Sequence, residues 1–303
     1  MDELSVLMLI ERTDMLGLPA DDPTDALRLA DWLEIVAVLS RDGNSSQGDL
    51  ERAFRRAALA EYSDDESIER KLLDVFAELE RRAQAAGAAY PFVIGYGVIQ
   101  RRSRWEDFPA YVFCLCLSYF DLTATGHAPK LFERVSCWAA KGYLKGDAVG
   151  FGWPRSDLPT SFAEAVTELC KRIGEGVGFR QQPELDRKDD KLDVVAWRDF
   201  ADKQPSKLIL FGQCAAGRNW EEKLGELQPE AFYKQWMQVP PLSPPVKSFF
   251  VPHRIHSGKW TYVANNAGIL FERCRIAFWA HQQIADYNPH ISWVRELLSN
   301  VAA

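Results

Sequence analysis

The chain lacks a long apolar run, a leader-like N-terminus, an internal repeat and a low-complexity segment. None of its hydrophobic stretches approaches the roughly 20 residues that cross a bilayer, so the sequence predicts no membrane-spanning helix. The first residues, Met-Asp-Glu-Leu, contain neither the basic segment nor the small-residue cleavage site of a signal peptide. We therefore expect a cytoplasmic protein with no membrane partner.

Paired cysteine spacing is also missing. The six cysteines stand at positions 114, 116, 137, 170, 214 and 274, most of them inside apolar runs, and no two form a Cys-x-x-Cys motif. That spacing argues against a zinc site, and a disulfide framework is typical of much smaller secreted chains. The cysteines are therefore expected to be buried free thiols.

Positive charge is scarce in the first third of the chain. Residues 1–100 hold 20 acidic and 10 basic side chains, a balance of −10, within a net charge of −7 for all 303 residues. Residues 201–275 hold 10 basic and 6 acidic side chains, a balance of +4. This asymmetry favours a C-terminal half that meets phosphate and an N-terminal half that does not. Ordinary fluctuation in composition would produce the same pattern.

Hydrophobic periodicity divides the chain into two parts. Helical patterns cover residues 25–40, 49–60, 67–87, 107–121 and 129–144, with one β-like segment at 90–101. A Gly/Pro-rich connection at 150–159 follows and is the expected domain boundary. We expect a helical N-terminal domain over 1–150, suited to binding a protein partner, and a second domain over 151–303.

The second domain alternates between helical and strand patterns. The sequence predicts a helix at 161–173, strands at 177–180, 190–197 and 207–214, a helix at 219–239, a strand at 247–252 and a closing helix at 267–285. The order from 161 to 252 is therefore α-β-β-β-α-β. The predicted fold class is α/β with mixed α+β character, in which a helical N-terminal region precedes this core and a C-terminal helix follows it.

Two of the predicted strands carry a polar side chain in apolar surroundings. Asp193 stands at the head of one strand and Gln213 at the tail of the next. A carboxylate and an amide on adjacent strands supply the oxygen ligands that a hard divalent cation takes. A divalent cation beside a phosphate is a common means of cutting a phosphodiester. The pattern therefore favours nuclease chemistry.

The run from Ser161 to Cys214 resembles the core of the restriction-endonuclease-like PD-(D/E)xK nucleases, and within them the Mrr-like branch. In the order of that family's motifs, the run contains Phe162, Val166 and Leu169, then Asp190-Lys191-Leu192-Asp193, then Ile209 to Gln213. The resemblance covers roughly residues 160–255, about a third of the chain. It implies a DNA endonuclease that depends on Mg²⁺ or Mn²⁺ and often serves bacterial antiviral defence.

The resemblance also implies a set of site residues. The catalytic metal ligands would be Asp193, Gln213, Glu164 and the backbone carbonyl of Cys214. Glu168, one turn after Glu164, is an alternative helix acid. Glu133 follows Leu-Phe and imitates the helix motif more closely, but it lies one helix earlier in the chain.

One motif position departs from the family. Ala215 stands where the family has a lysine, and alanine cannot stabilise charge on a phosphate. Lys223 on the following predicted helix is the natural catalytic substitute, because a long lysine stem reaches several ångströms. The residues expected to contact nucleic acid are Arg218, Lys223, His253 and Arg254.

Other functions stay open. Asp193 would equally serve as a turn residue and Gln213 as a partner of backbone groups. A nuclease fold without activity would bind nucleic acid or a partner protein, and Ala215 favours that alternative. A cysteine-protease-like enzyme would use Cys214 as nucleophile with His253 or His256 as base. The sequence also leaves open whether the chain forms a homo-oligomer.

Overall fold

The computed structural model describes residues 16–19, 22, 25–57, 64–122, 126–181 and 188–301. The chain divides into two compact units. Unit 1 comprises Met1–Phe120 and Asp286–Ala303, and unit 2 comprises Asp121–Ala285. The divisions thus fall near residues 120 and 285, whereas the sequence suggested one boundary near 150. Every helix in the described ranges is too short or too polar to span a bilayer.

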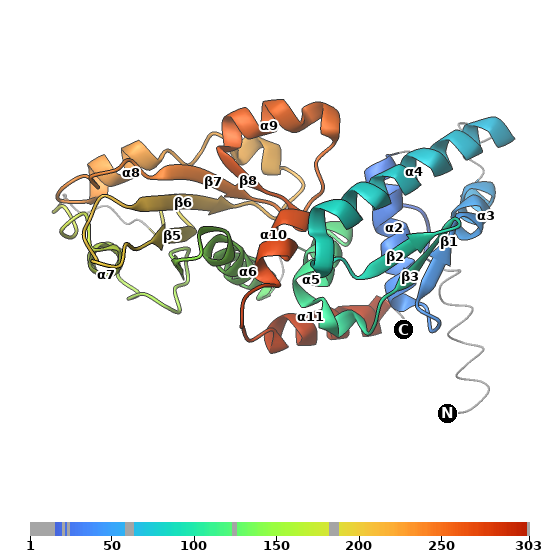
Figure 1. Cartoon of the computed structure of the whole chain (residues 1–303), viewed down its shortest axis with the longest axis horizontal. Helices are drawn as coiled ribbons and strands as arrows, with labels where there is room; N and C mark the ends of the chain where they lie inside the picture. Colours follow the sequence, from blue (N-terminus) through green and yellow to red (C-terminus); the bar gives the residue numbers. More distant parts are fainter. Residues whose placement is uncertain are drawn as a thin grey trace. The chain divides into compact units, whose positions relative to one another are not determined.

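Unit 1 combines helices with a small antiparallel sheet (Figure 1). Its helices are α2 (Ala26–Leu39), α3 (Gln47–Ala57), α4 (Asp65–Ala86), α5 (Pro109–Tyr119) and α11 (Asn288–Val301), with 3-10 turns η2 (Gly87–Ala89) and η3 (Trp105–Asp107). Its strands are β1 (Asn44–Ser46), β2 (Phe92–Gly95) and β3 (Val98–Arg101), in the order β1-β3-β2. The region predicted as helical therefore contains a sheet, of which the sequence indicated only the segment at 90–101.

The hairpin between β2 and β3 follows from its turn residues. Gly95 pairs with Val98, which leaves a two-residue turn of Tyr96 and Gly97. Both turn residues have positive φ, +50° and +71°. Two-residue hairpins favour this left-handed conformation because it matches the twist of the flanking strands.

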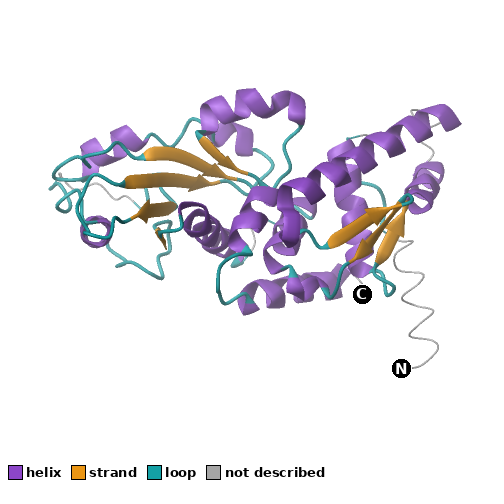
Figure 2. Cartoon of the chain, viewed as in Figure 1, coloured by secondary structure: helices purple, strands orange, loops and turns teal. Residues whose placement is uncertain are grey.

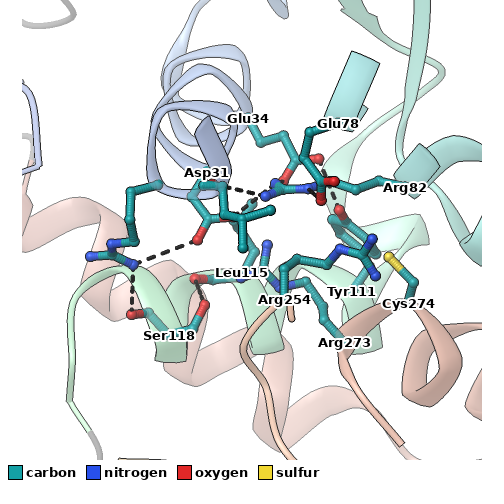
Figure 3. Close-up of polar contacts among 12 residues, drawn as sticks. Asp31, Glu34, Glu78, Arg82, Tyr111, Leu115, Ser118, Arg254, Arg273 and Cys274 are labelled. Carbon is teal, nitrogen blue, oxygen red and sulfur yellow. Dashed lines mark hydrogen bonds and ion pairs between the residues drawn. The ribbon is translucent and has the colours of Figure 1, made fainter. Parts of the chain in front are cut away.

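A buried ion cluster lies in the core of unit 1 (Figure 3). The fully buried Arg82 guanidinium pairs with Asp31 at 2.8 Å, with Glu34 at 2.8 Å and with Glu78 at 2.9 Å. Tyr111 donates its hydroxyl proton to Glu34 at 2.8 Å. Burial opposes the charge on Arg82, but the three carboxylates raise its pKa above the usual value. Each charge depends on the others, because a buried ion is tolerated only when it is paired.

Unit 2 is built around a five-stranded mixed sheet (Figure 2). The strands are β4 (Asp147–Gly150), β5 (Val194–Arg198), β6 (Leu208–Cys214), β7 (Val246–Phe250) and β8 (Ile269–Phe271), side by side in that order. β5 pairs antiparallel with β4 and β6, and β7 pairs parallel with β6 and β8. The helices are α6 (Ala128–Leu144), α7 (Phe162–Ile173), α8 (Pro229–Trp236), α9 (Trp260–Ala267) and α10 (Arg273–Ala280), with 3-10 turns η4 (Trp220–Lys223) and η5 (Ser257–Lys259).

Helices cover both faces of this sheet. On one face, Val195 and Phe211 join a core with residues of α7 and α8, among them Phe232. Towards the opposite face, the Tyr143 ring of α6 lies 5.3 Å from the ring of Phe271 in β8. Side chains alternate between the two faces of a strand, so the core on each face draws on every second residue.

Two glycines allow α6 to approach its neighbours closely. A Cβ added to Gly142 would lie 2.4 Å from the carbonyl oxygen of Trp279 in α10. A Cβ added to Gly146 would lie 2.0 Å from the carbonyl oxygen of Trp197 in β5. Only a residue without a side chain fits at such distances from backbone atoms.

The elements predicted for unit 2 agree with the structure in part. α7, β6 and β7 lie within two residues of their predicted bounds. The strand predicted at 177–180 is wrong, because Phe179 forms only one bridge, with Met237. The helix predicted at 219–239 divides into η4 and α8, since Gly225 and Pro229 interrupt it. The closing helix predicted at 267–285 is wrong over its first residues, because β8 occupies Ile269–Phe271 and the helix α10 spans only Arg273–Ala280. From α6 to β7 the observed order is α6-β4-α7-β5-β6-α8-β7, which differs from the predicted α-β-β-β-α-β order by one helix between the first two strands.

Candidate functional site

Three segments meet at the edge of the unit 2 sheet where β4 and β6 end and β5 begins. Asp193 stands directly before β5, and its Oδ2 accepts a hydrogen bond from the Cys214 amide at 2.7 Å. The Asp193 carbonyl accepts from the amides of Phe151 at 2.7 Å and Gly152 at 3.2 Å. Residues following both neighbouring strands thus fix the Asp193 carboxylate at this edge.

Glu133 reaches the same edge from the second turn of α6. Its side chain is 12% exposed and accepts a hydrogen bond from the Lys130 ammonium at 2.5 Å. Lys130 also donates to the Gly152 carbonyl at 2.7 Å, which joins α6 to the segment after β4. A Cβ added to Gly152 would lie 2.6 Å from Glu133 Oε2, so glycine makes room for the carboxylate.

The electrostatics of this edge are those of a negative cluster. Burial raises the pKa of the Asp193 carboxyl well above its usual value, and the charge of Glu133 raises it further. Burial also raises the pKa of Glu133, while Lys130 opposes that rise. Asp189, in the turn before β5, adds negative charge that raises both pKa values. Carboxyls with raised pKa values at a sheet edge are candidates for a functional site.

Lys130 stands where the helix itself disfavours a cation. It lies in the first turn of α6, which holds no acidic residue. The positive end of a helix dipole stabilises carboxylates there and opposes ammonium groups. A residue placed against its local preference is more typical of a functional site than of a structural one.

The structure does not bring Gln213 to this cluster. The Gln213 amide nitrogen donates to Glu226 at 2.7 Å, and its oxygen accepts from the Leu227 amide at 3.2 Å. The predicted convergence of the side chains at 193 and 213 is therefore not found. Cys214, in contrast, lies beside Asp193 through its backbone amide.

The predicted helix acids lie on α7 rather than on the helix that supplies the cluster. Glu164 is exposed in the first turn of α7, and Glu168 forms an ion pair with Arg172 at 3.0 Å. The glutamate whose charge acts on Asp193 is instead Glu133 of α6. The Leu-Phe-Glu sequence was the available signal, and the short strand β4 that makes α6 the first core helix was missed.

The predicted cations are placed as follows. Lys223, the predicted catalytic cation, is the last residue of η4. The charges that act most strongly on the Asp193 carboxyl are instead those of Glu133, Asp189 and Lys130. Ala215, at the motif position, is buried in an apolar cluster. Lys130 is bound to Glu133, and the charge of Arg155 also acts on Glu133. The sequence pattern did not predict either cation.

The predicted nucleic-acid contacts are engaged within unit 2. Arg218 pairs with Asp121 at 3.1 Å, and the buried Arg254 pairs with Glu272 at 2.5 Å. His253 Nε2 lies 2.8 Å from the Ala216 carbonyl oxygen. Arg254 in particular serves the core, because its carboxylate partner also caps α10.

The Cys214 thiol has the opposite character to a catalytic nucleophile. Burial raises its pKa well above the usual value, and the charge of Asp193 adds to this rise. Reactive cysteines need a lowered pKa, supplied by a cation or a helix N-terminus. This electrostatic environment argues against the protease alternative.

The metal expected from the sequence can be tested against these donors. Among the residues that the structure describes, no group of three or more His, Cys, Asp or Glu side chains is arranged to hold a metal ion. Mg²⁺ usually needs only one or two carboxylates, with waters and substrate phosphates completing its shell. Glu133 and Asp193 fit this smaller donor set, because a divalent cation would offset the negative charge that raises the Asp193 pKa.

Comparisons of the chain with protein-family models, with curated proteins and with solved structures find no match.

Proposed function

We propose that the chain is a metal-dependent DNA endonuclease whose site is formed by Glu133, Asp193 and Lys130. The observation that carries this proposal is that these three residues converge on Gly152 at one sheet edge: Lys130 donates to its carbonyl, Asp193 accepts from its amide through the backbone, and the Glu133 carboxylate lies against its Cα. Further support comes from the sheet, in which β4, β5 and β6 run antiparallel and β7 joins β6 in parallel after α8; the order from α6 to β7 differs from the α-β-β-β-α-β pattern of the nuclease family that the sequence resembles by the helix α7 between β4 and β5.

Each residue has a distinct task in this proposal. Asp193 and Glu133 would hold Mg²⁺ or Mn²⁺, which when bound lowers the pKa of a water and offsets charge on the phosphate. The Cys214 amide holds the Asp193 carboxylate in place. Lys130 orients Glu133 and, being 29% exposed, presents positive charge to a phosphate at the sheet edge. Fixed positive charge stabilises the negative charge that builds up during cleavage.

The test is cleavage of supercoiled plasmid with Mg²⁺ or Mn²⁺. We expect the wild type to nick or linearise the plasmid and EDTA to prevent this. Asp193→Asn and Lys130→Met should each slow cleavage by about 100-fold or more, the usual loss when one electrostatic contributor is removed. Glu164→Gln and Lys223→Met should cleave at the wild-type rate, because those side chains lie outside the cluster.

Two results would contradict the proposal. One is wild-type protein that does not cleave with either metal. The other is equal cleavage by the wild type and Asp193→Asn, which would identify a contaminating nuclease. If Lys223→Met loses cleavage and Lys130→Met keeps it, the endonuclease activity stands, but Lys223 rather than Lys130 supplies the catalytic positive charge.

Gln213 and Ala215 favour a second candidate function, a nuclease-like module that binds nucleic acid without cutting it. The Gln213 amide is held by Glu226 and Leu227, and Ala215 is core. This candidate predicts that the protein binds DNA in EDTA and that neither metal starts cleavage. Binding without cleavage would select it over the endonuclease.

A further inference from the structure

A basic stripe runs along α6, the helix that supplies Glu133. Its members are the basic residues Lys130, Arg134, Lys141 and Lys145, together with the aromatic Trp138 between them; Lys145 is the C-cap residue. Their spacings of four, four and three residues place Lys130, Arg134, Trp138 and Lys141 on one side of a helix of 3.6 residues per turn, and Lys145 follows as the left-handed C-cap residue. The stripe from Lys130 to Lys145 covers about 22 Å at 1.5 Å per residue.

The charge of this helix is strongly one-sided. α6 and its C-cap carry four basic residues and one acidic residue, Glu133. Glu133 is bound by Lys130, and Lys141 pairs with Asp147 at 3.2 Å. Arg134 and Lys145 are exposed, and within the described ranges neither has a carboxylate at ion-pair distance. Helix electrostatics account for basic residues at the C-terminal end but not for Lys130 or Arg134.

Arg134 is held in a defined direction. Its guanidinium lies over the Trp138 ring, 5.6 Å from the ring centroid. Stacking on an aromatic face keeps a guanidinium extended while leaving its N–H donors available. This preorganisation suits recognition of a phosphate, which accepts hydrogen bonds from such a fork.

We propose that the α6 stripe binds the phosphate backbone of duplex DNA and leads it to the Glu133–Asp193 edge. About 22 Å corresponds to roughly six base steps of 3.4 Å along a strand. The substrate identity rests on the proposed function, because the stripe begins at the lysine that contacts Glu133. The binding itself is independent of cleavage and is measurable without metal.

The experiment is fluorescence anisotropy of a labelled 20-base-pair duplex in EDTA, titrated between 50 and 200 mM KCl. The full-length wild type is compared with the double variant Arg134→Gln/Lys145→Gln. Each phosphate contact contributes a slope of about −0.9 to the dependence of log affinity on log salt. We therefore expect the double variant to bind about tenfold or more weakly, with a slope smaller by about two.

The matched control is Lys171→Gln/Lys234→Gln, which removes two exposed cations from α7 and α8 of the same unit. Their side chains are 82% and 62% exposed. We expect this control to keep the wild-type affinity and slope. Thermal denaturation of all three proteins should agree within a few degrees, because surface substitutions change stability little.

Several outcomes would overturn the assignment. The first is a wild type that does not bind the duplex at 50 mM KCl. The second is an equal salt-dependence slope in the two double variants. The third is equal competition for binding by polyglutamate and by unlabelled duplex at matched charge. The last would assign the stripe to an acidic protein segment. Stripe-dependent binding without metal-dependent cleavage would refute only the proposed function. Normal cleavage and binding in the stripe variant would refute only the stripe.

Discussion

At the scale of single residues, the proposed chemistry needs Asp193 and Glu133 in the charged form, which their burial makes less stable. Asp193 and Glu133 both have raised pKa values, chiefly because burial disfavours their charged forms. The folded protein therefore binds protons at these sites more tightly than the unfolded chain does. Their favourable contribution is complete below the unfolded carboxyl pKa of about 4 and is lost as pH rises through the raised values.

Asp193→Asn should remove part of this conflict. Asparagine can still accept from the Cys214 amide through its Oδ1, but it carries no charge. In EDTA, we expect the variant to melt at a higher temperature than the wild type, by a margin that grows from pH 5 to pH 8. Glu164→Gln, at an exposed position, should show no such trend. A margin that stays constant or shrinks with pH would contradict the prediction.

Arg82→Met tests the ion cluster of unit 1. The methionine leaves Asp31, Glu34 and Glu78 buried without their shared cation. Breaking a buried ion pair from one side costs about 3–5 kcal/mol, so urea should unfold the unit at clearly lower concentration. Arg70→Met, on the exposed side of the same helix, should cost less than about 1 kcal/mol. Similar midpoints for the two variants would mean that the cluster contributes little.

At the scale of elements, close backbone approach fixes how α6 sits in unit 2. Gly142→Ala would normally favour a helix by about 1 kcal/mol. Here the new methyl group would collide with the Trp279 carbonyl of α10, so we expect a loss of about 1–3 kcal/mol instead. Gly225→Ala, with no atom within 4 Å of its added Cβ, is the control and should be neutral or slightly stabilising. Chemical denaturation gives both values, and a stabilising Gly142→Ala would refute the close crossing.

Sequence patterns predicted the elements whose apolar spacing is long and regular. α7, β6 and β7 belong to this class. β4 was missed because it has four residues and ends in glycine directly before a Gly/Pro-rich stretch, which hides a strand inside a loop pattern. The strand predicted at 177–180 failed for the converse reason. Gly176 and Gly178 both have positive φ, and Val177 shares it at +65°, which extended strand geometry does not allow.

The candidate site was predictable only in part. The sequence identified Asp193 because it precedes an apolar strand. The choice between Glu133 and Glu164 depended on which helix begins the core, and that depended on the missed β4. Motif spacing did not indicate Lys130. Its contact with Glu133 depends on a separation of one helical turn, and its contact with the Gly152 carbonyl depends on the fold.

At the scale of the whole molecule, each unit has a core of its own. Unit 1 is organised around the Arg82 cluster and unit 2 around its five-stranded sheet. Cores of this kind can unfold separately, so a single two-state transition is not expected. Calorimetry should show two transitions, with Arg82→Met lowering one and Gly142→Ala the other. A single transition lowered by both variants would show that the units unfold as one.

Unit 1 is assembled from the two ends of the chain, with Phe113 of α5 packed edge-on against His290 and Trp293 of α11 at ring separations of 4.9 and 5.2 Å. From Tyr119 to Asn288 the ribosome adds 169 residues, which takes roughly 10 to 30 seconds at typical elongation rates. Throughout that interval the apolar surface of α5 has been made but α11, which covers it, has not. Nascent protein should therefore recruit chaperones at this stage, and slower translation of the inserted unit should lengthen that exposure.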